Sequence, residues 1–218
     1  MIRQLLLPGT AAEETFSDIC GAALFPAEEA ALSGAPAQRR AEFATGRACA
    51  RAALAALGLP ATAILPGQRG EPLWPAGVTG SITHCAGYRA CAAARLGSAA
   101  AIGIDAEPNR PLPDGVLADV AVPAERGWLA DHMATAPEVC WDRLLFSVKE
   151  SVYKAWFPLT GRQLRFQDAV VTIGPDGHGF VVRVLAPGAV AAGRRLSQLE
   201  GSWLTDGGLV ITAVTVPA

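Results

Sequence analysis

Two acids at the end of an apolar run could hold a divalent cation. In "AIGIDAEP", residues 101–108, small and apolar side chains lead into Asp105 and Glu107. Side chains two apart on a strand project from the same face, so the two carboxylates point together. They repel each other unless a cation lies between them. A site with only one or two carboxylates suits Mg²⁺, which takes its remaining ligands from substrate phosphates and water. The alternative is a strand end with both acids in solvent.

A helix further along the chain carries a second polar group. In "CWDRLLFSVKESVYKAWF" the core-facing stripe has helical spacing and consists of Trp141, Leu145, Val148, Val152 and Ala155. The opposite side carries Arg143, Ser147, Glu150 and Lys154. Taken alone, Glu150 and Lys154 form an ordinary helix pair, worth about 0.2 to 0.5 kcal/mol. The flanking aromatics argue instead for a second layer that places these charges in a cleft; they are Phe146, Tyr153, Trp156 and Phe157.

Basic residues gather on an earlier helix, predicted over residues 37–57 and ended by Gly58 and Pro60. Its apolar face consists of Phe43, Gly46, Ala50, Leu54 and Leu57, and its flank carries Arg40, Arg47 and Arg51. These arginines are either an anion-binding row or solvated side chains whose stems cover alanine-rich surface. His84, in "GSITHCAGY", is either a hydrogen-bonded structural residue or a phosphate donor.

The elements around these residues predict an α+β fold. Short strands are expected in "GSITHCAGYRACAAARL" and "AAAIGIDAE", followed by a connection over residues 107–115. A short irregular helix over residues 116–131 and a strong helix over residues 137–157 come next. The tail is of β type, with hairpin turns at Asp176-Gly177 and Asp206-Gly207-Gly208. Helices and runs of strands do not alternate singly, which favours α+β over a parallel sheet.

Composition excludes several classes of protein. A net charge of −2 over 218 residues offers no bulk attraction to nucleic acid or to anionic membranes. Five scattered cysteines indicate reduced packing residues in a cytoplasmic protein, and we expect neither a secretory signal nor a membrane span. The three histidines are not spaced for zinc, and no Walker A, G-x-G-x-x-G, G-x-S-x-G or H-E-x-x-H motif is present. Any chemistry must rest on acids, a metal and basic side chains.

Taken together, four segments resemble the Sfp/EntD-type 4′-phosphopantetheinyl transferases: "GEPLWP", "GSITHCAGY", "IGIDAE" and "LLFSVKESVYKAWFPLTGR". They are similar to actinobacterial members that serve fatty-acid, polyketide, nonribosomal peptide and siderophore synthesis. The resemblance covers about residues 38–165. It implies a pseudodimer of two similar α/β halves. Residues 1–110 would carry the coenzyme A phosphate site and the first metal acids, and residues 111–218 the catalytic helix and carrier-protein docking.

The resemblance also implies an activity and residue roles. The family moves the phosphopantetheine arm of coenzyme A to a serine of an apo acyl or peptidyl carrier protein and releases adenosine 3′,5′-bisphosphate. Asp105, Glu107 and Glu150 would bind Mg²⁺, Glu150 would also act as the base, and Lys154 would neutralise the pyrophosphate. The residues implied in coenzyme A binding are Arg40, Arg47, Arg69, Gly70, Glu71, Pro72, Thr83, His84, Asp105 and Lys154. Ala106 departs from relatives that carry a third acid there, which leaves the metal with more water.

These expectations have rivals. The first is a non-catalytic module that binds coenzyme A or a carrier protein, which the loss of one of the three acids would favour. The second is another Mg²⁺-dependent phosphoryl or nucleotidyl transferase. The oxygen ligands suit Mn²⁺ as well as Mg²⁺. We expect a monomer, because a fused pseudodimer contains both halves of its site, and no nucleic-acid or membrane partner.

Overall fold

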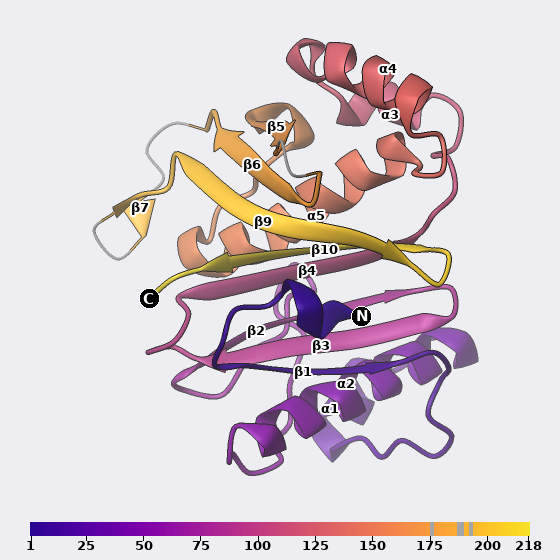
Figure 1. Ribbon diagram of the computed structural model, residues 1–218. Helices are drawn as coiled ribbons and strands as arrows, with labels where there is room; N and C mark the ends of the chain where they lie inside the picture. The colour runs from indigo at the N-terminus through magenta and orange to yellow at the C-terminus, as the bar shows by residue number, and fades with distance from the viewer. Residues whose placement is uncertain (175–176, 187–189, 192–193) are drawn as a thin grey trace.

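The computed structural model describes residues 1–174, 177–186, 190–191 and 194–218 (Figure 1). Its helices are η1 Ile2–Leu5, α1 Pro26–Ala31, α2 Ala37–Ala56, α3 Val116–Val120, η2 Pro123–Glu125, α4 Arg126–Thr135, α5 Trp141–Thr160 and η3 Phe166–Asp168. Its strands are β1 Thr10–Thr15, β2 Val78–Cys85, β3 Tyr88–Arg95, β4 Ala101–Pro108, β5 Ala169–Ile173, β6 Gly179–Val184, β7 Val190–Ala191, β8 Arg194–Arg195, β9 Gln198–Asp206 and β10 Leu209–Val216.

Two antiparallel sheets each pack against one long helix. The order β1-β3-β2 forms the first sheet, and α2 lies on β1 and β3 (Figure 1). The order β4-β10-β9-β6-β5 forms the second sheet, and α5 packs mainly on β4 and β10. Strands β7 and β8 pair separately. The predicted α+β class is confirmed.

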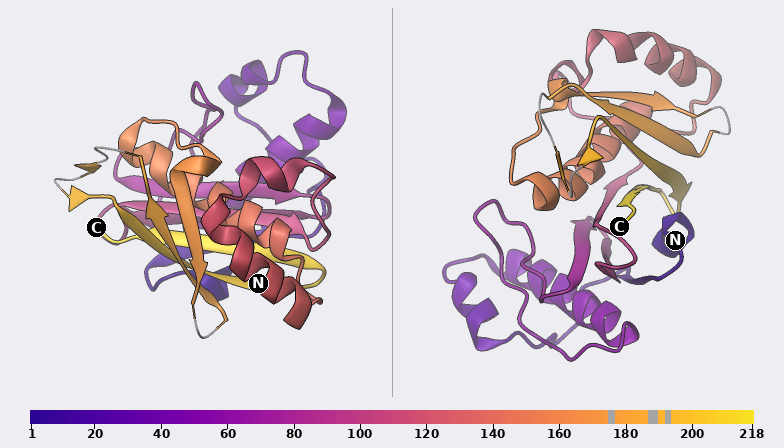
Figure 2. Two further views of the ribbon diagram at one scale, coloured as in Figure 1. Left: turned by 90° about the horizontal axis from the view of Figure 1, so that it is seen from above. Right: turned by 90° about the vertical axis from the view of Figure 1, so that its left-hand side faces the viewer.

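The two sheets meet along β4. One edge of this strand pairs with β10 in a regular antiparallel ladder. On its other side, two backbone N–H groups donate to hydroxyls of β2: that of Ile104 to Ser81 Oγ at 3.1 Å, and that of Ala106 to Thr83 Oγ1 at 3.2 Å. Side-chain hydroxyls thus satisfy polar groups that a continuous sheet would pair with carbonyls. Figure 2 shows the part with α2 and the part with α4 and α5 on either side of this seam. The division at residues 110 and 111 stays a prediction, although β4 itself is hydrogen-bonded into the second sheet.

The two long helices agree with the sequence pattern except at the ends of α5. Helix α2 spans Ala37–Ala56 and is followed by Gly58 in the left-handed region. Helix α5 begins at Trp141, later than predicted, and continues to Thr160, past the predicted end. Pro158 does not stop it, because a proline in the last turn removes only one intrahelical hydrogen bond before Gly161 ends the helix.

The turn and cysteine predictions have mixed outcomes. Gly207 and Gly208, both with positive φ, connect β9 to β10 as expected. Gly177 also has a positive φ, whereas Asp176 lies outside the described residues. All five cysteines have free thiols, and Cys49 and Cys91 are buried, but Cys20 is exposed, so the packing prediction is wrong there. Across the described ranges, no helix combines the length and the apolar character that crossing a bilayer requires.

Candidate active site

An ion pair at the seam joins Asp105 of β4 to Lys154 of α5. The lysine Nζ lies 2.7 Å from Asp105 Oδ1 and also donates to the carbonyl oxygen of Ile104 at 3.1 Å. Thr83 of β2 donates to the same Oδ1 at 3.3 Å, and Asp105 is only 5% exposed. The ordinary Glu150–Lys154 helix pair, the alternative that the flanking aromatics argued against, is therefore not formed, since α5 packs against β4 and Lys154 pairs with a strand carboxylate instead. The Glu150 side chain makes no hydrogen bond or ion pair with any residue that the structure describes.

Close backbone contact fixes the register of this pair. A Cβ at Gly103 would lie 1.9 Å from the carbonyl oxygen of Ser151 and 2.7 Å from the nitrogen of Ala155. Only glycine allows α5 to lie this close to β4, because any side chain would collide with helix backbone. Gly103 thereby sets the distance across which Lys154 meets Asp105, two residues further along the strand.

The three acids influence one another without forming a closed cluster. Glu107 pairs with Arg143 Nη1 at 3.0 Å. The pKa of Glu107 is raised by burial and by the negative charge of Asp105, which outweigh Arg143 and Lys154. The pKa of Glu150 is raised by burial and then by Asp105, with a smaller contribution from Glu107. The negative charges of the three carboxylates therefore act on one another, and an added positive charge would stabilise their ionised forms.

The donor set fits a divalent cation in its chemistry. Asp105 Oδ2 is buried and has no hydrogen-bond partner in the described part of the chain, which leaves one carboxylate oxygen with an unused lone pair. The neighbouring acids are oxygen donors of the kind that Mg²⁺ prefers. Among the described residues, however, no three of the His, Cys, Asp and Glu side chains already converge as a metal site. Lys154 takes up the other oxygen of Asp105.

Position 106 faces away from these acids. Ala106 is fully buried in an apolar cluster with Ile102, Ile104 and Ile211, on the opposite face of β4 from Asp105 and Glu107. An acid at this position would point into that core. The absence of a third acid at position 106 thus removes no group from the Asp105 face.

A pocket of about 240 Å³ lies beside the ion pair, between α5, β2 and the loop before β2. It is lined by Arg69, Gly70, Glu71, Pro72, Gly80, Ser81, Ile82, Glu150, Tyr153, Lys154, Phe157 and Pro158. The predicted loop residues and the two predicted α5 residues are thus brought together. Arg69 is exposed, and its guanidinium forms no hydrogen bond or ion pair with a described residue, whereas the Glu71 carboxylate accepts the Arg69 backbone N–H at 2.8 Å and closes the turn.

Each of the three arginines predicted on the flank of α2 has a partner within the chain. Arg47 is buried, donates to the carbonyl oxygen of Ile64 at 2.6 Å, and stacks on Phe43. Arg51 pairs with Glu28 at 3.1 Å, and Arg40 pairs with Glu29 and the carbonyl oxygen of Leu32. The solvated alternative is wrong for Arg47. None of the three arginines lines the pocket. The pocket therefore does not support the predicted role of Arg40 and Arg47 in coenzyme A binding, and that role stays a prediction.

These buried charges anchor the pocket loop. Glu28 is completely buried and accepts the backbone N–H of Ile64 at 2.8 Å, while Arg47 binds the carbonyl group of the same residue. Beyond Ile64, Leu73 donates to Leu65 at 2.8 Å, which closes the loop that carries Arg69. Glu28 was not predicted as a functional residue, because a glutamate in a first turn is typical of a solvated helix start.

Other site residues were missed or only partly identified. Thr83, predicted to bind coenzyme A, contacts the ion pair, and its coenzyme A role stays a prediction. The next residue, His84, is exposed and outside the pocket, with its Nε2 3.0 Å from Arg39 Nη1. Arg39 was not singled out, although it adjoins Arg40 on the predicted helix. Tyr153 was treated only as part of an aromatic flank, yet it lines the pocket between Glu150 and Phe157.

Comparisons with known proteins show the family of the chain. The model of the 4′-phosphopantetheinyl transferase N-terminal domain matches residues 27–94, and that of the 4′-phosphopantetheinyl transferase superfamily matches residues 101–212. The chain is 54% identical to 4′-phosphopantetheinyl transferase Svp of Streptomyces mobaraensis, over 100% of this chain and 90% of that protein. It is 46% identical to 4′-phosphopantetheinyl transferase PptT of Mycobacterium tuberculosis, over 97% of this chain and 96% of that protein.

A more distant relative extends the set. The chain is 31% identical to enterobactin synthase component D of Salmonella typhi, over 84% of this chain and 75% of that protein. The two family models together span α2, β2, β4 and α5, the elements that carry the ion pair and line the pocket. The chain therefore belongs to the 4′-phosphopantetheinyl transferase superfamily and is a transferase of its Sfp/EntD type.

Proposed function

We propose that the chain transfers the 4′-phosphopantetheine arm of coenzyme A to a serine of apo acyl or peptidyl carrier proteins, with Glu150 as the base. Glu150 lines two pockets. One is the pocket shared with Arg69 and Lys154, and the other, of about 490 Å³, runs along α5 and η3. A base between two openings can meet coenzyme A from one side and a carrier serine from the other. This position carries the proposal.

The raised pKa of Glu150 suits this role. Burial and the neighbouring acids make its carboxylate a stronger proton acceptor than an exposed glutamate. Glu150 accepts the serine proton, and the serine oxygen forms a bond to the β-phosphorus of the coenzyme A pyrophosphate. The bond from that phosphorus to the bridging oxygen breaks, and adenosine 3′,5′-bisphosphate leaves with the bonding electron pair. Lys154 Nζ stabilises the charge that develops on the pyrophosphate.

We further propose that Asp105, Glu107 and Glu150 bind Mg²⁺, with Mn²⁺ as an alternative. A divalent cation at these acids would supply charge neutralisation for the pyrophosphate. The unused oxygen of Asp105 and the raised pKa values of Glu107 and Glu150 support this assignment. The chain's own part is to hold three carboxylates on two rigid elements, β4 and α5.

Coenzyme A would occupy more than the smaller pocket. Its volume of about 240 Å³ lies just below the usual range for ligand sites, so it would hold only part of the molecule. Arg69, whose guanidinium has no hydrogen-bond or ion-pair partner among the described residues, is the pocket residue best placed to bind a phosphate, and Tyr153 and Phe157 provide an apolar wall. A non-catalytic binding module is not favoured, because all three acids and Lys154 are present.

The test is to incubate the protein with coenzyme A, Mg²⁺ and an apo carrier protein, and to weigh the carrier by intact-mass spectrometry. The carrier should gain one phosphopantetheine arm. Glu150→Gln should lower the rate by about 10²- to 10⁴-fold, the usual contribution of a general base, and keep coenzyme A binding in calorimetry. Glu138→Gln removes the same charge from an exposed residue and should have no effect. An unmodified carrier would contradict the function, and near-wild-type turnover by Glu150→Gln would contradict the assigned base.

A further inference from the structure

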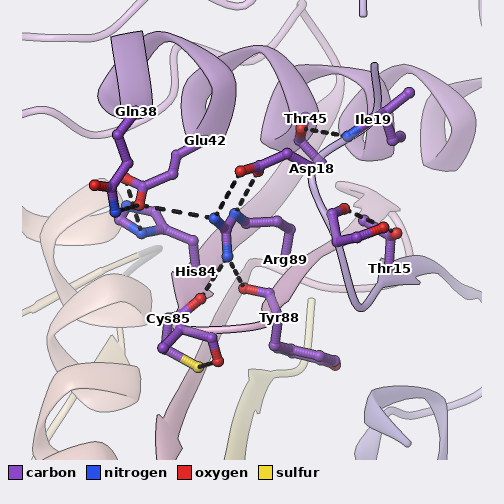
Figure 3. A network of polar contacts seen from close by, with 12 residues as sticks. Thr15, Asp18, Ile19, Gln38, Glu42, Thr45, His84, Cys85, Tyr88 and Arg89 are labelled. Carbon is purple, nitrogen blue, oxygen red and sulfur yellow. Dashed lines mark hydrogen bonds and ion pairs between the residues drawn. The ribbon is translucent and has the colours of Figure 1, made fainter. Parts of the chain in front are cut away.

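A second polar cluster lies at the end of the β2–β3 hairpin, outside the pocket (Figure 3). We call it the Arg89 cluster; it consists of Asp18, Arg39, Glu42, His84 and Arg89. Arg89 is only 5% exposed, which is unusual for an arginine without a partner that holds it. Its side chain joins three parts of the chain, namely the segment after β1, helix α2 and the hairpin.

The guanidinium of Arg89 fixes the backbone next to His84. Its Nε and Nη2 donate to both carboxylate oxygens of Asp18, at 3.0 and 3.2 Å. Its Nη1 donates to the carbonyl oxygens of Cys85 and Tyr88, the latter at 3.0 Å. Because His84 and Arg89 are partners in the antiparallel register, these bonds hold the turn that directly follows His84.

Glu42 of α2 is shared among three basic side chains. Its carboxylate oxygens lie 3.7 Å from Arg89 Nη2, 3.9 Å from Arg39 Nη1 and 3.9 Å from His84 Nδ1. Arg89 thus has two acids within reach, Asp18 in a bidentate pair and Glu42 at longer range. If Asp18 lost its charge, Arg89 would attract Glu42 more strongly and withdraw it from Arg39 and His84.

The contact between Arg39 and His84 defines the histidine tautomer. Arg39 Nη1 lies 3.0 Å from His84 Nε2, and a guanidinium can only donate. His84 Nε2 must therefore be the acceptor, so the neutral ring carries its hydrogen on Nδ1, which faces Glu42. The pKa of His84 is lowered, first by partial desolvation of its otherwise exposed side chain and then by the charge of Arg39, in agreement with a neutral ring.

The Arg89 cluster adjoins the active site. Burial, followed by the negative charges of Glu107 and Asp105, raises the pKa of the Cys85 thiol to about 12, and Lys154 is also near enough to act on it. The residue before His84, Thr83, donates to Asp105. A change at the end of the hairpin would therefore alter the surroundings of the proposed coenzyme A site.

We propose that Asp18 and Arg89 are positioning residues, which hold His84 as the neutral Nδ1–H tautomer and keep Arg39 bound to its Nε2, so that the two side chains present one fixed cation to a coenzyme A phosphate. This inference rests on the proposed function. Neither Asp18 nor Arg89 faces the pocket, so both act through His84 and Glu42.

The first test is kinetic and uses Asp18→Asn, which removes one exposed charge and leaves the buried Arg89 paired with Glu42. KM for coenzyme A should rise by about 3- to 10-fold, the effect of weakening one charge-assisted contact, with kcat within twofold of wild type. Asp131→Asn, an exposed site on α4, is the matched control and should change neither value. A variant that loses thermal stability or kcat while KM stays constant would show a merely structural role and overturn the proposal.

The second test reads the tautomer directly by long-range ¹H–¹⁵N NMR of the imidazole nitrogens. The chain has only three histidines, so comparison with His84→Gln assigns the signals. In the wild-type protein His84 should show a protonated Nδ1 and a bare Nε2, and Asp18→Asn should shift it toward a mixture of tautomers. A wild-type ring protonated on Nε2 would overturn the proposal. This measurement needs no transfer activity, so its outcome stands apart from failure of the proposed function.

Discussion

The ion pair between Asp105 and Lys154 is not built as a structural ion pair would be. Removing two charges from water is costly, and the cost is recovered only when the remaining lone pairs and protons are also satisfied. Here one oxygen of Asp105 has no hydrogen-bond partner in the described chain. The buried pair of Lys149 and Glu125 differs, because Lys149 donates to two carbonyls and Glu125 accepts two backbone N–H groups. The incomplete pair at Asp105 is the one that can accept a further cation.

Replacing Lys154 with glutamine should separate its two roles. The rate of phosphopantetheine transfer should fall by about 10²- to 10³-fold, because a charge that stabilises the transition state is lost. Mn²⁺ affinity, measured by electron paramagnetic resonance without coenzyme A, should stay equal or increase, because the lysine no longer competes for Asp105 Oδ1. Thermal stability should drop in chelator, since Asp105 is left buried without a cation, and should recover with Mn²⁺.

Lys149→Gln is the matched control on the same helix. It breaks the buried pair with Glu125, whose Nζ–Oε2 distance is 2.8 Å, and should lose stability that Mn²⁺ does not restore. Weaker Mn²⁺ binding by Lys154→Gln would contradict the competition between the lysine and the metal.

At the scale of elements, the local sequence pattern predicted the helices, strands and turns that depend on neighbouring residues alone. Alanine and leucine content placed α2, short apolar runs between glycines placed β2, β3 and β4, and the glycine turn placed the β9–β10 hairpin. The pairing of β4 with β10 was not predictable, because the two strands are far apart in sequence and nothing in either one names its partner. The arginines of α2 were misjudged for the same reason. Arg47 bonds to Ile64, a contact that only the packed fold creates.

The proximity of the acids on β4 to Glu150 was likewise not a result of spacing. It followed from the resemblance of "IGIDAE" and "FSVKESVYK" to a known family. The residues alone left both sets open to a solvated interpretation. What decides between the interpretations is the burial of Asp105, which requires β4, β2 and α5 to be assembled around it.

Gly103 is the element-scale residue whose replacement is most informative. In Gly103→Ala the new Cβ would meet the Ser151 carbonyl oxygen at 1.9 Å, so α5 must move away from β4 by more than 1 Å. We expect a loss of about 3 kcal/mol in the free energy of unfolding, from overpacking against rigid backbone. The transfer rate of the folded fraction should also fall, because Lys154 and Glu150 move with the helix.

Gly97→Ala provides the matched control for that substitution. Its Cβ would meet nothing within 4 Å, and the residue lies between β3 and β4. Urea denaturation and carrier-protein mass spectrometry should leave this variant unchanged. Wild-type stability and rate in Gly103→Ala would show that α5 does not depend on the close contact with β4.

At the scale of the whole molecule, the site depends on parts that the sequence keeps far apart. The pocket takes residues from the loop anchored at Ile64, from β2 of the first sheet and from α5 on the second sheet. Among the described residues, the hydrogen bonds across the seam include two from the backbone to the hydroxyls of Ser81 and Thr83, that of Thr83 to Asp105, and that of Lys154 to Thr83. A buried apolar cluster also joins β3 to β4 and β10 there. A ligand that touches all three parts would add contacts across this seam.

Coenzyme A should therefore stabilise the entire chain. At a concentration 100 times its Kd, binding to the folded state alone adds about 2.7 kcal/mol to the free energy of unfolding. For a chain of this size each kcal/mol corresponds to about 2–4 °C, so Tm should rise by about 5–11 °C in differential scanning fluorimetry. Arg69→Ala should leave the Tm of the unliganded protein unchanged, because its guanidinium has no partner among the described residues. At the same coenzyme A concentration the variant should show a smaller rise. An equal rise in Arg69→Ala would remove that arginine from the phosphate site, and no rise in the wild-type protein would show that coenzyme A does not bind the folded chain.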